Sequence, residues 1–266
     1  MRRTWGFLLL LLLPSALSAQ GDTLTRASLT VMAERGAIAE WLLQYDAVAW
    51  ISSDSVVAAP DSLKARLGPE WFADTARGSW HVFYGSYDVT VDRYSIAFHY
   101  SGPSARTLRS STEDVDTLRV LASARALYST QARLPADFAP AGLRFNQYLR
   151  RPTSDTLEVW LLPAFQTNGL LVIGSEATYR WDRLGSRLVD STLRIARYRA
   201  FRPDTTVEAT VAAEDAEYPT VGHLFFLRAY SSYFRKLAIR TQRLYTTVFN
   251  GPDGPALISA LRDSTP

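Results

Sequence analysis

The spacing of apolar residues near the start of the chain predicts a long helix. Five of them recur at steps of seven, four, three and four residues and so share one helix face: Val31, Ile38, Leu42, Tyr45 and Ala49. Asp22 or Thr23 can cap the start of this helix, and Gly36 weakens its middle. We expect a loop at 52–60 and then a short helix at 60–67.

A period-two alternation of apolar and polar residues predicts strands further along the chain. Tyr94, Ile96, Phe98 and Tyr100 alternate with Ser95, Ala97 and His99. We expect this strand to pair with 80–91 through a turn at Asp92-Arg93. Further strands are expected at 145–149, 157–162, 170–181, 187–200, 207–212, 224–229 and, in pieces, 237–249.

One helix interrupts these strands. Ser110 and Glu113 have the spacing of a capping box, and the helix that follows is expected to run to Leu134, before Pro135. The glycines and prolines of 250–255 predict a break, and a short final helix is expected at 256–261.

These elements predict an α+β fold, with an N-terminal helix and one inserted helix packed on a largely antiparallel β-sheet of about seven strands. Residues 20–250 are expected to form a single domain, and a subdivision near 135–142 stays open. Residues 251–266 are expected to form a short helix and tail.

The register of one hairpin can be predicted from its side chains. Pairing Tyr179 with Ser191 also pairs Ala177 with Leu193 and Trp181 with Val189, which keeps one face mostly apolar. The other face then places Glu176 opposite Arg194 and Arg180 opposite Asp190. Each opposite-charge pair adds about 0.2–1 kcal/mol to such a hairpin.

The first nineteen residues have the pattern of a secretory signal peptide. Arg2 and Arg3 precede an apolar run at 7–13, and small residues follow Pro14. The run is shorter than the ~20 residues that cross a bilayer, so we expect cleavage and no integral membrane segment afterwards. The cleavage site, after Ser18 or Ala19, stays open.

The composition limits the cellular compartments in which such a protein is expected to function. There is no cysteine, which excludes disulfides, cysteine-rich zinc sites and a lipid attached to cysteine. None of the three asparagines is followed two residues later by serine or threonine, so the chain has no N-glycosylation pattern. We therefore expect a bacterial protein that is periplasmic or secreted and is not a lipoprotein.

The charge of the chain argues against a nucleic-acid partner. The formal net charge is +3, and Arg2 and Arg3 leave with the signal, so the remainder is close to neutral. A strongly basic footprint is absent. The arginines of 194–202 are expected to line a solvated strand edge rather than to bind a polyanion.

The sequence offers few candidates for chemistry. A metal site would need two of the three histidines to converge, usually with a carboxylate. The predicted turn keeps His81 and His99 apart, so we expect no metal and no other cofactor. The patterns Gly-x-Ser-x-Gly and Ser-x-x-Lys are absent. The candidate catalytic residues are His223, which follows a glycine, with Glu176 and Arg180.

Five segments of the chain together carry a resemblance to other proteins. They include Tyr45–Asp54, Gly78–Gly85, Leu157–Ala164, Ile173–Arg180 and Pro219–Leu227. The chain therefore resembles a family of uncharacterised exported bacterial proteins. This resemblance implies no reaction and no catalytic residues.

Two functions follow as hypotheses. The first is a non-catalytic module of the cell envelope that binds a ligand or an envelope partner through one face of the sheet. The alternative is a hydrolase acting on an envelope polymer or ester. A site that joins His223 to a carboxylate and a serine would favour the hydrolase.

Overall fold

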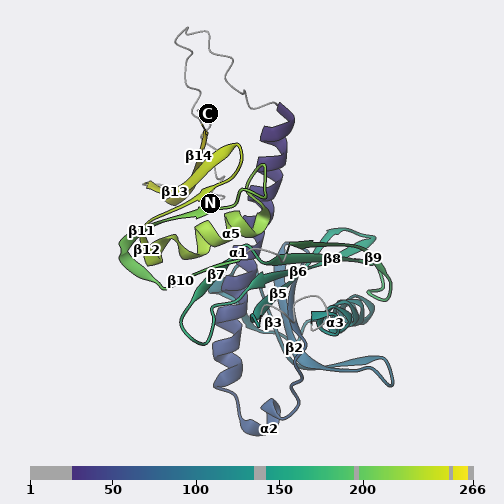
Figure 1. Ribbon diagram of the computed structural model, residues 1–266. Coiled ribbons are helices and arrows are strands. Elements are labelled where there is room, and N and C mark those ends of the chain that lie inside the picture. Colours follow the sequence, from purple (N-terminus) through teal and green to yellow (C-terminus); the bar gives the residue numbers. More distant parts are fainter. Residues whose placement is uncertain (1–25, 135–141, 195–197, 252–253, 263–266) are drawn as a thin grey trace.

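A computed structural model of the protein describes residues 26–134, 142–194, 198–251 and 254–262. The fold is α+β, as predicted: helices pack on mostly antiparallel sheets (Figure 1). The expected signal peptide at 1–19 and the expected subdivision near 135–142 lie outside the described residues, except for Gly142. No described helix is long and apolar enough to cross a membrane.

The longest helix, α1 (Arg26–Val57), confirms the first prediction and extends it. Leu42 and Tyr45 are fully buried, whereas Val31 is exposed. The expected loop from 52 is wrong, because the helix continues to Val57. Ser52 fits there because its hydroxyl donates to the Val48 carbonyl (2.7 Å) and is hydrogen-bonded to the Tyr84 hydroxyl.

Two four-stranded antiparallel sheets follow α1 and the short α2 (Asp61–Lys64). The first has the order β1 (Trp71–Ala76), β2 (Ser79–Asp88), β3 (Arg93–Gly102) and β4 (Arg109–Ser110), with the 3-10 turn η1 (Ala105–Thr107) before β4. The second has the order β5 (Phe145–Thr153), β6 (Thr156–Pro163), β8 (Glu176–Asp182) and β9 (Leu188–Arg194).

The inserted helix, α3 (Thr117–Gln131), packs between these two sheets (Figure 1). The expected capping box is wrong, since Asp116 is the N-cap and accepts a hydrogen bond from the Arg119 amide (3.0 Å). Asp116 thus supplies the hydrogen-bond acceptor that a free backbone amide requires at the start of a helix. Leu118 is 74% exposed, whereas Leu127 is buried.

A third sheet closes the chain. Its order is β11 (Asp204–Ala212), β12 (Phe234–Arg240), β13 (Leu244–Gly251) and β14 (Gly254–Leu261), and β11 runs parallel to β12. A short ladder of β7 (Leu171–Ile173) and β10 (Arg199–Phe201) adjoins it.

Two expected elements have the wrong type. The expected strand at 224–229 lies in helix α5 (Val221–Tyr230), which the 3-10 turn η3 (Ser231–Tyr233) follows. A continuous apolar run fits either a strand or a buried helix, and the cap at Thr220 selects the helix. The expected helix at 256–261 is strand β14, because antiparallel pairing with β13 bonds a segment too short for a stable isolated helix.

The predicted hairpin of β8 and β9 is confirmed over most of its length. Tyr179 pairs with Ser191, Ala177 with Leu193 and Glu176 with Arg194. A bulge after Arg180 moves Leu188, rather than the expected Val189, opposite Trp181. The apolar face of β8 packs on α3, where the Trp181 indole donates to the Thr130 hydroxyl (3.0 Å).

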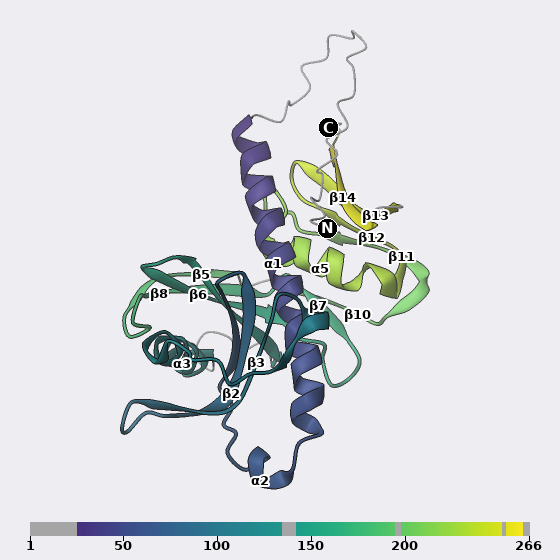
Figure 2. The ribbon, with the colours of Figure 1, turned by 180° about the vertical axis from the view of Figure 1, so that it is seen from behind.

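Helix α1 connects the parts of the molecule. It packs against β1–β3 on one side and against α5 of the C-terminal part on another (Figure 2). The start of α5 lies directly beside the beginning of β8, where the Gly222 amide donates a hydrogen bond to the Glu176 carboxylate.

Candidate functional site

Two of the three candidate catalytic residues meet at the start of α5. We call Thr220, Gly222, His223 and Glu176 the α5 cap. Thr220 is the N-cap, and its side chain accepts a hydrogen bond from the His223 amide (3.2 Å). The His223 imidazole returns the bond, because its Nδ1 accepts from the Thr220 amide (3.2 Å). His223 therefore takes the place of glutamate in a capping box.

The environment of His223 opposes protonation. Its side chain is buried, with 6% of the residue exposed. Burial lowers the pKa of His223 to about 4, and Asp215 opposes this effect while Arg194 and Arg35 add to it. At neutral pH the ring is uncharged, with Nδ1 as an acceptor.

Glu176 binds the other free donors of the cap. Its carboxylate accepts a hydrogen bond from the Gly222 amide (2.7 Å), and the Arg194 guanidinium lies 3.8 Å away. A negative charge at a helix N-terminus also complements the helix dipole. Burial raises the pKa of Glu176, while a hydrogen bond from the Thr220 side chain and the charge of Arg194 act in the opposite direction.

Gly222 allows this close approach. A Cβ atom at position 222 would overlap the Glu176 carboxylate. The glycine before His223 therefore serves the contact between the helix and the carboxylate.

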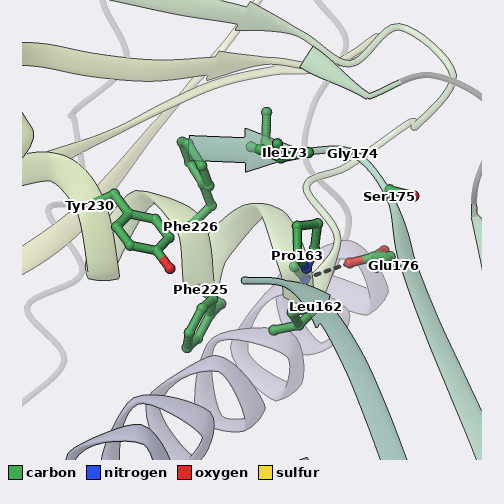
Figure 3. A pocket seen from close by; sticks show the side chains of 11 residues that line it. Leu162, Pro163, Ile173, Gly174, Ser175, Glu176, Phe225, Phe226 and Tyr230 are labelled. Carbon is green, nitrogen blue, oxygen red and sulfur yellow. Dashed lines mark hydrogen bonds between the residues drawn. The ribbon is translucent and has the colours of Figure 1, made fainter. Parts of the chain in front are cut away.

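A small cavity adjoins the α5 cap. Its walls include Ser175, Glu176 and Gly222, together with Phe226 and Tyr230 of α5 (Figure 3). Its volume is about 10 Å³, which is roughly the space for one water molecule. Such a cavity has no room for a substrate.

The cavity brings together only part of a hydrolytic site. Ser175 is fully buried, and its hydroxyl has no hydrogen-bond partner among the described residues. His223 is not one of the residues that line the cavity, and its Nδ1 is occupied by the Thr220 amide. A serine nucleophile needs a base within hydrogen-bond reach, and here that pairing is not made.

Arg180 does not join this group. It lies opposite Asp190, as predicted, and its guanidinium approaches Glu158 at 3.7 Å. Arg150 binds the same carboxylate at 3.2 Å. Arg180 therefore belongs to a row of alternating charges that crosses the second sheet.

This row lies on the open face of the second sheet, which we define by six residues. They occupy facing positions on neighbouring strands: Arg150, Glu158, Trp160, Thr178, Arg180 and Thr192. The opposite face packs on α3. Arg180 and Thr192 are exposed, Arg150, Trp160 and Thr178 are half-buried, and Glu158 is buried. The Trp160 ring packs partly against the core beside α1, and its indole donates to Glu158 (3.4 Å).

The expectation that His81 and His99 lie apart is wrong. Nδ1 of His81 and Nε2 of His99 are 3.1 Å apart in a hydrogen bond, and we call these residues the histidine pair. The turn spans 89–92 rather than the expected two residues, so that Asp88 pairs with Arg93. A bulge between Tyr84 and Gly85 then moves the ladder back by one residue.

The corrected register makes the two histidines diagonal neighbours. His99 lies opposite Phe83, two residues from His81 on the same face of the sheet. Burial lowers the pKa of His99, His81 lowers it further, and Glu113 opposes both. The opposite charges of Asp88 and Arg93 were the available signal for the true turn.

The comparisons with known proteins identify no family. No family model and no curated protein matches the chain. One solved structure, a bifunctional GH43-CE protein of Bacteroides eggerthii, has 10% sequence identity and a TM-score of 0.16. The match covers 77% of this chain and 25% of that one. A similarity at that TM-score supports no conclusion about fold or activity.

Proposed function

We propose that the protein is an exported, non-catalytic module of the bacterial cell envelope that binds a ligand on the open face of the second sheet. One observation carries this proposal: the candidate acid–base residues His223 and Glu176 cap a buried helix. Their hydrogen bonds are made within the protein, and the adjoining cavity has space for about one water molecule. A catalytic role would require breaking the α5 cap.

The expected export rests on the sequence. Residues 1–19 have the order of a signal peptide, and the chain has no cysteine that could carry a lipid. We therefore propose a periplasmic or secreted location and an envelope component as the binding partner.

The charges of the open face indicate the class of ligand. Arg150 and Arg180 both lie beside Glu158, and Asp190 lies opposite Arg180, so two negative charges compensate the two positive charges of the row. A polyanion finds little net attraction on such a surface. Trp160 offers an aromatic ring, and Thr178 and Thr192 offer hydroxyl groups. This combination suits a neutral, hydroxyl-rich polymer such as an uncharged polysaccharide.

Binding measurements on defined polymers test the proposal. We expect the purified protein to bind a neutral glucan in calorimetric titrations and to leave the polyanion alginate unbound. Trp160→Ala is expected to weaken glucan binding about tenfold, as is typical of an aromatic anchor. Trp50→Ala is the matched control, because Trp50 is a tryptophan of α1 that is 67% exposed and is not part of the open face.

Other results contradict the proposal. Tighter binding of alginate than of any neutral polymer would show that the charges of the face are not compensated. Equal losses in Trp160→Ala and Trp50→Ala would place the ligand elsewhere. Hydrolysis of an envelope polymer or ester that is lost in His223→Ala, with the folded state retained, would establish the hydrolase instead.

A further inference from the structure

The histidine pair has a geometry that its structural role does not require. The two rings are within 18° of parallel, and their centroids are 5.3 Å apart. With a nitrogen–nitrogen distance of 3.1 Å, the two nitrogens face each other almost directly. Phe83 stacks on His99 with a centroid distance of 4.7 Å, which holds that ring in place.

The distance between the nitrogens matches the spacing of two ligands on one metal ion. Imidazole nitrogens bind Zn²⁺ at about 2.0–2.1 Å, so two of them at a tetrahedral angle are about 3.3 Å apart. The observed 3.1 Å is close to that spacing. Turning each ring within its own plane by about 35°, which keeps the stacking on Phe83, would aim both lone pairs at a common point beside the line that joins the nitrogens.

The acidic neighbours of the pair differ in availability. Asp74 lies opposite His81, but its carboxylate is bound by Arg119 (2.6 Å) and Arg151 (3.1 Å). Glu113 lies in the segment before α3, close enough to influence His99 electrostatically. Within the described part of the chain, no group of three histidine or acidic residues is already arranged to hold a metal.

We propose that His81 and His99 form a two-histidine site for a divalent transition-metal ion of the zinc or copper class, with the remaining coordination positions open to water. Binding needs no net loss of protons. In the hydrogen bond one of the two facing nitrogens carries a proton, and metal binding requires that ring to change tautomer. The His81 proton then lies on Nε2 and the His99 proton on Nδ1, so both facing nitrogens donate lone pairs and no proton is lost. The hydrogen bond between the rings is replaced by two metal–nitrogen bonds.

This inference is independent of the proposed function. The pair belongs to the first sheet, whereas the open face belongs to the second, and neither site shares a residue with the other. A failure of glucan binding would therefore say nothing about the metal site. The metal titration tests that site separately.

Zinc titration of the purified protein, free of any histidine tag, tests the site. We expect one equivalent of Zn²⁺ to bind, in competition with a fluorescent chelator. His81→Gln and His99→Gln are each expected to weaken binding at least about tenfold, because even changes of outer-shell partners cost ~10–100-fold. His223→Gln is the matched control and is expected to keep the affinity unchanged.

A gain of affinity provides a second test that does not depend on removing a residue. Ser101 lies opposite His81 and two residues from His99 on the same strand face. Ser101→His would add a third imidazole and is expected to tighten Zn²⁺ binding at least about tenfold, since three histidines form a common zinc site. Adding His81→Gln to this variant should remove the gain.

Three results would overturn the inference. The first is the absence of Zn²⁺ and Cu²⁺ binding by the wild type at concentrations that saturate Ser101→His. The second is an equal affinity in the wild type and in the double variant His81→Gln, His99→Gln. The third is Cu²⁺ broadening of the His223 imidazole resonances in NMR spectra while those of His81 and His99 stay sharp.

Discussion

The α5 cap and the histidine pair both place histidine in a hydrogen bond, but they differ in what surrounds it. His223 is buried, and its Nδ1 accepts from the backbone of its own helix turn. His81 and His99 are half-buried, and their side chains hydrogen-bond to each other through the facing nitrogens. In the α5 cap, a backbone amide needs the histidine as its hydrogen-bond acceptor. In the histidine pair, the strands β2 and β3 are held together by their own backbone hydrogen bonds.

This difference separates side chains that hold the fold together from side chains that are available to bind a ligand. Removing a partner from the α5 cap leaves a buried backbone amide without an acceptor, which costs about 1–3 kcal/mol. Removing one ring from the histidine pair leaves a half-exposed nitrogen that water can satisfy. Only the second arrangement can exchange its hydrogen bond for a ligand at low cost.

Acid is expected to reveal the largest difference between the two regions. Burial lowers the pKa of His223 from 6.5 to about 4, so the unfolded chain takes up the proton first. The contribution of His223 to stability is complete above pH 6.5 and falls as the pH drops toward 4. The loss between pH 7 and pH 4 is about 3 kcal/mol. Urea unfolding at several pH values measures it.

The variant His223→Gln isolates this effect from other titrating groups. Glutamine also suits the third position of a capping box and does not titrate. Burial raises the pKa of Glu176, so its protonation in acid stabilises the fold and partly offsets the loss in both proteins. Identical pH profiles for the wild type and His223→Gln would contradict a buried, neutral His223.

A substitution at Gly222 is expected to have the next largest effect. The added Cβ of Gly222→Ala would displace the Glu176 carboxylate from its hydrogen bonds, at a cost of about 2 kcal/mol. Gly36→Ala is the control, since no atom lies within 4 Å of a Cβ in the middle of α1. It should stabilise the protein by ~0.5–1 kcal/mol, and thermal unfolding of both variants measures the contrast.

The smallest effect is expected in the histidine pair. His99→Phe keeps an aromatic ring against Phe83 and removes the hydrogen bond to His81, at a cost of about 0.5–1 kcal/mol. Denaturant unfolding at pH 7 measures this cost. A loss as large as that of Gly222→Ala would mean that the pair is as structural as the α5 cap.

The parts of the fold that follow from short-range patterns were predictable from the sequence. The hairpin of β8 and β9 was one, because a one-residue slip would place Tyr179 and Ala177 on the wrong face. The second half of α1 was another, since Leu42 and Tyr45 repeat at helical spacing. The α+β class followed from the mixture of both periods.

Where the apolar residues follow neither a helical nor a strand period, contacts with other segments decided whether the segment formed a helix or a strand. The apolar run at 224–227 became a helix because Thr220 and Glu176 satisfy the amides at its start. The segment at 256–261 became a strand because β13 offered it an edge. Thr220 and β13 lie close in the sequence to the segments they determine, whereas Glu176 is 46 residues from Gly222.

The candidate sites show the same division. The sequence alone determined which residues could perform acid–base or metal chemistry, since three histidines and the absence of cysteine leave few choices. Only the tertiary structure decided their roles. It placed Glu176 on the α5 amides, and it brought His81 beside His99 through a four-residue turn and a bulge. Side-chain type limits the chemistry, but register and burial decide which groups meet and which remain accessible.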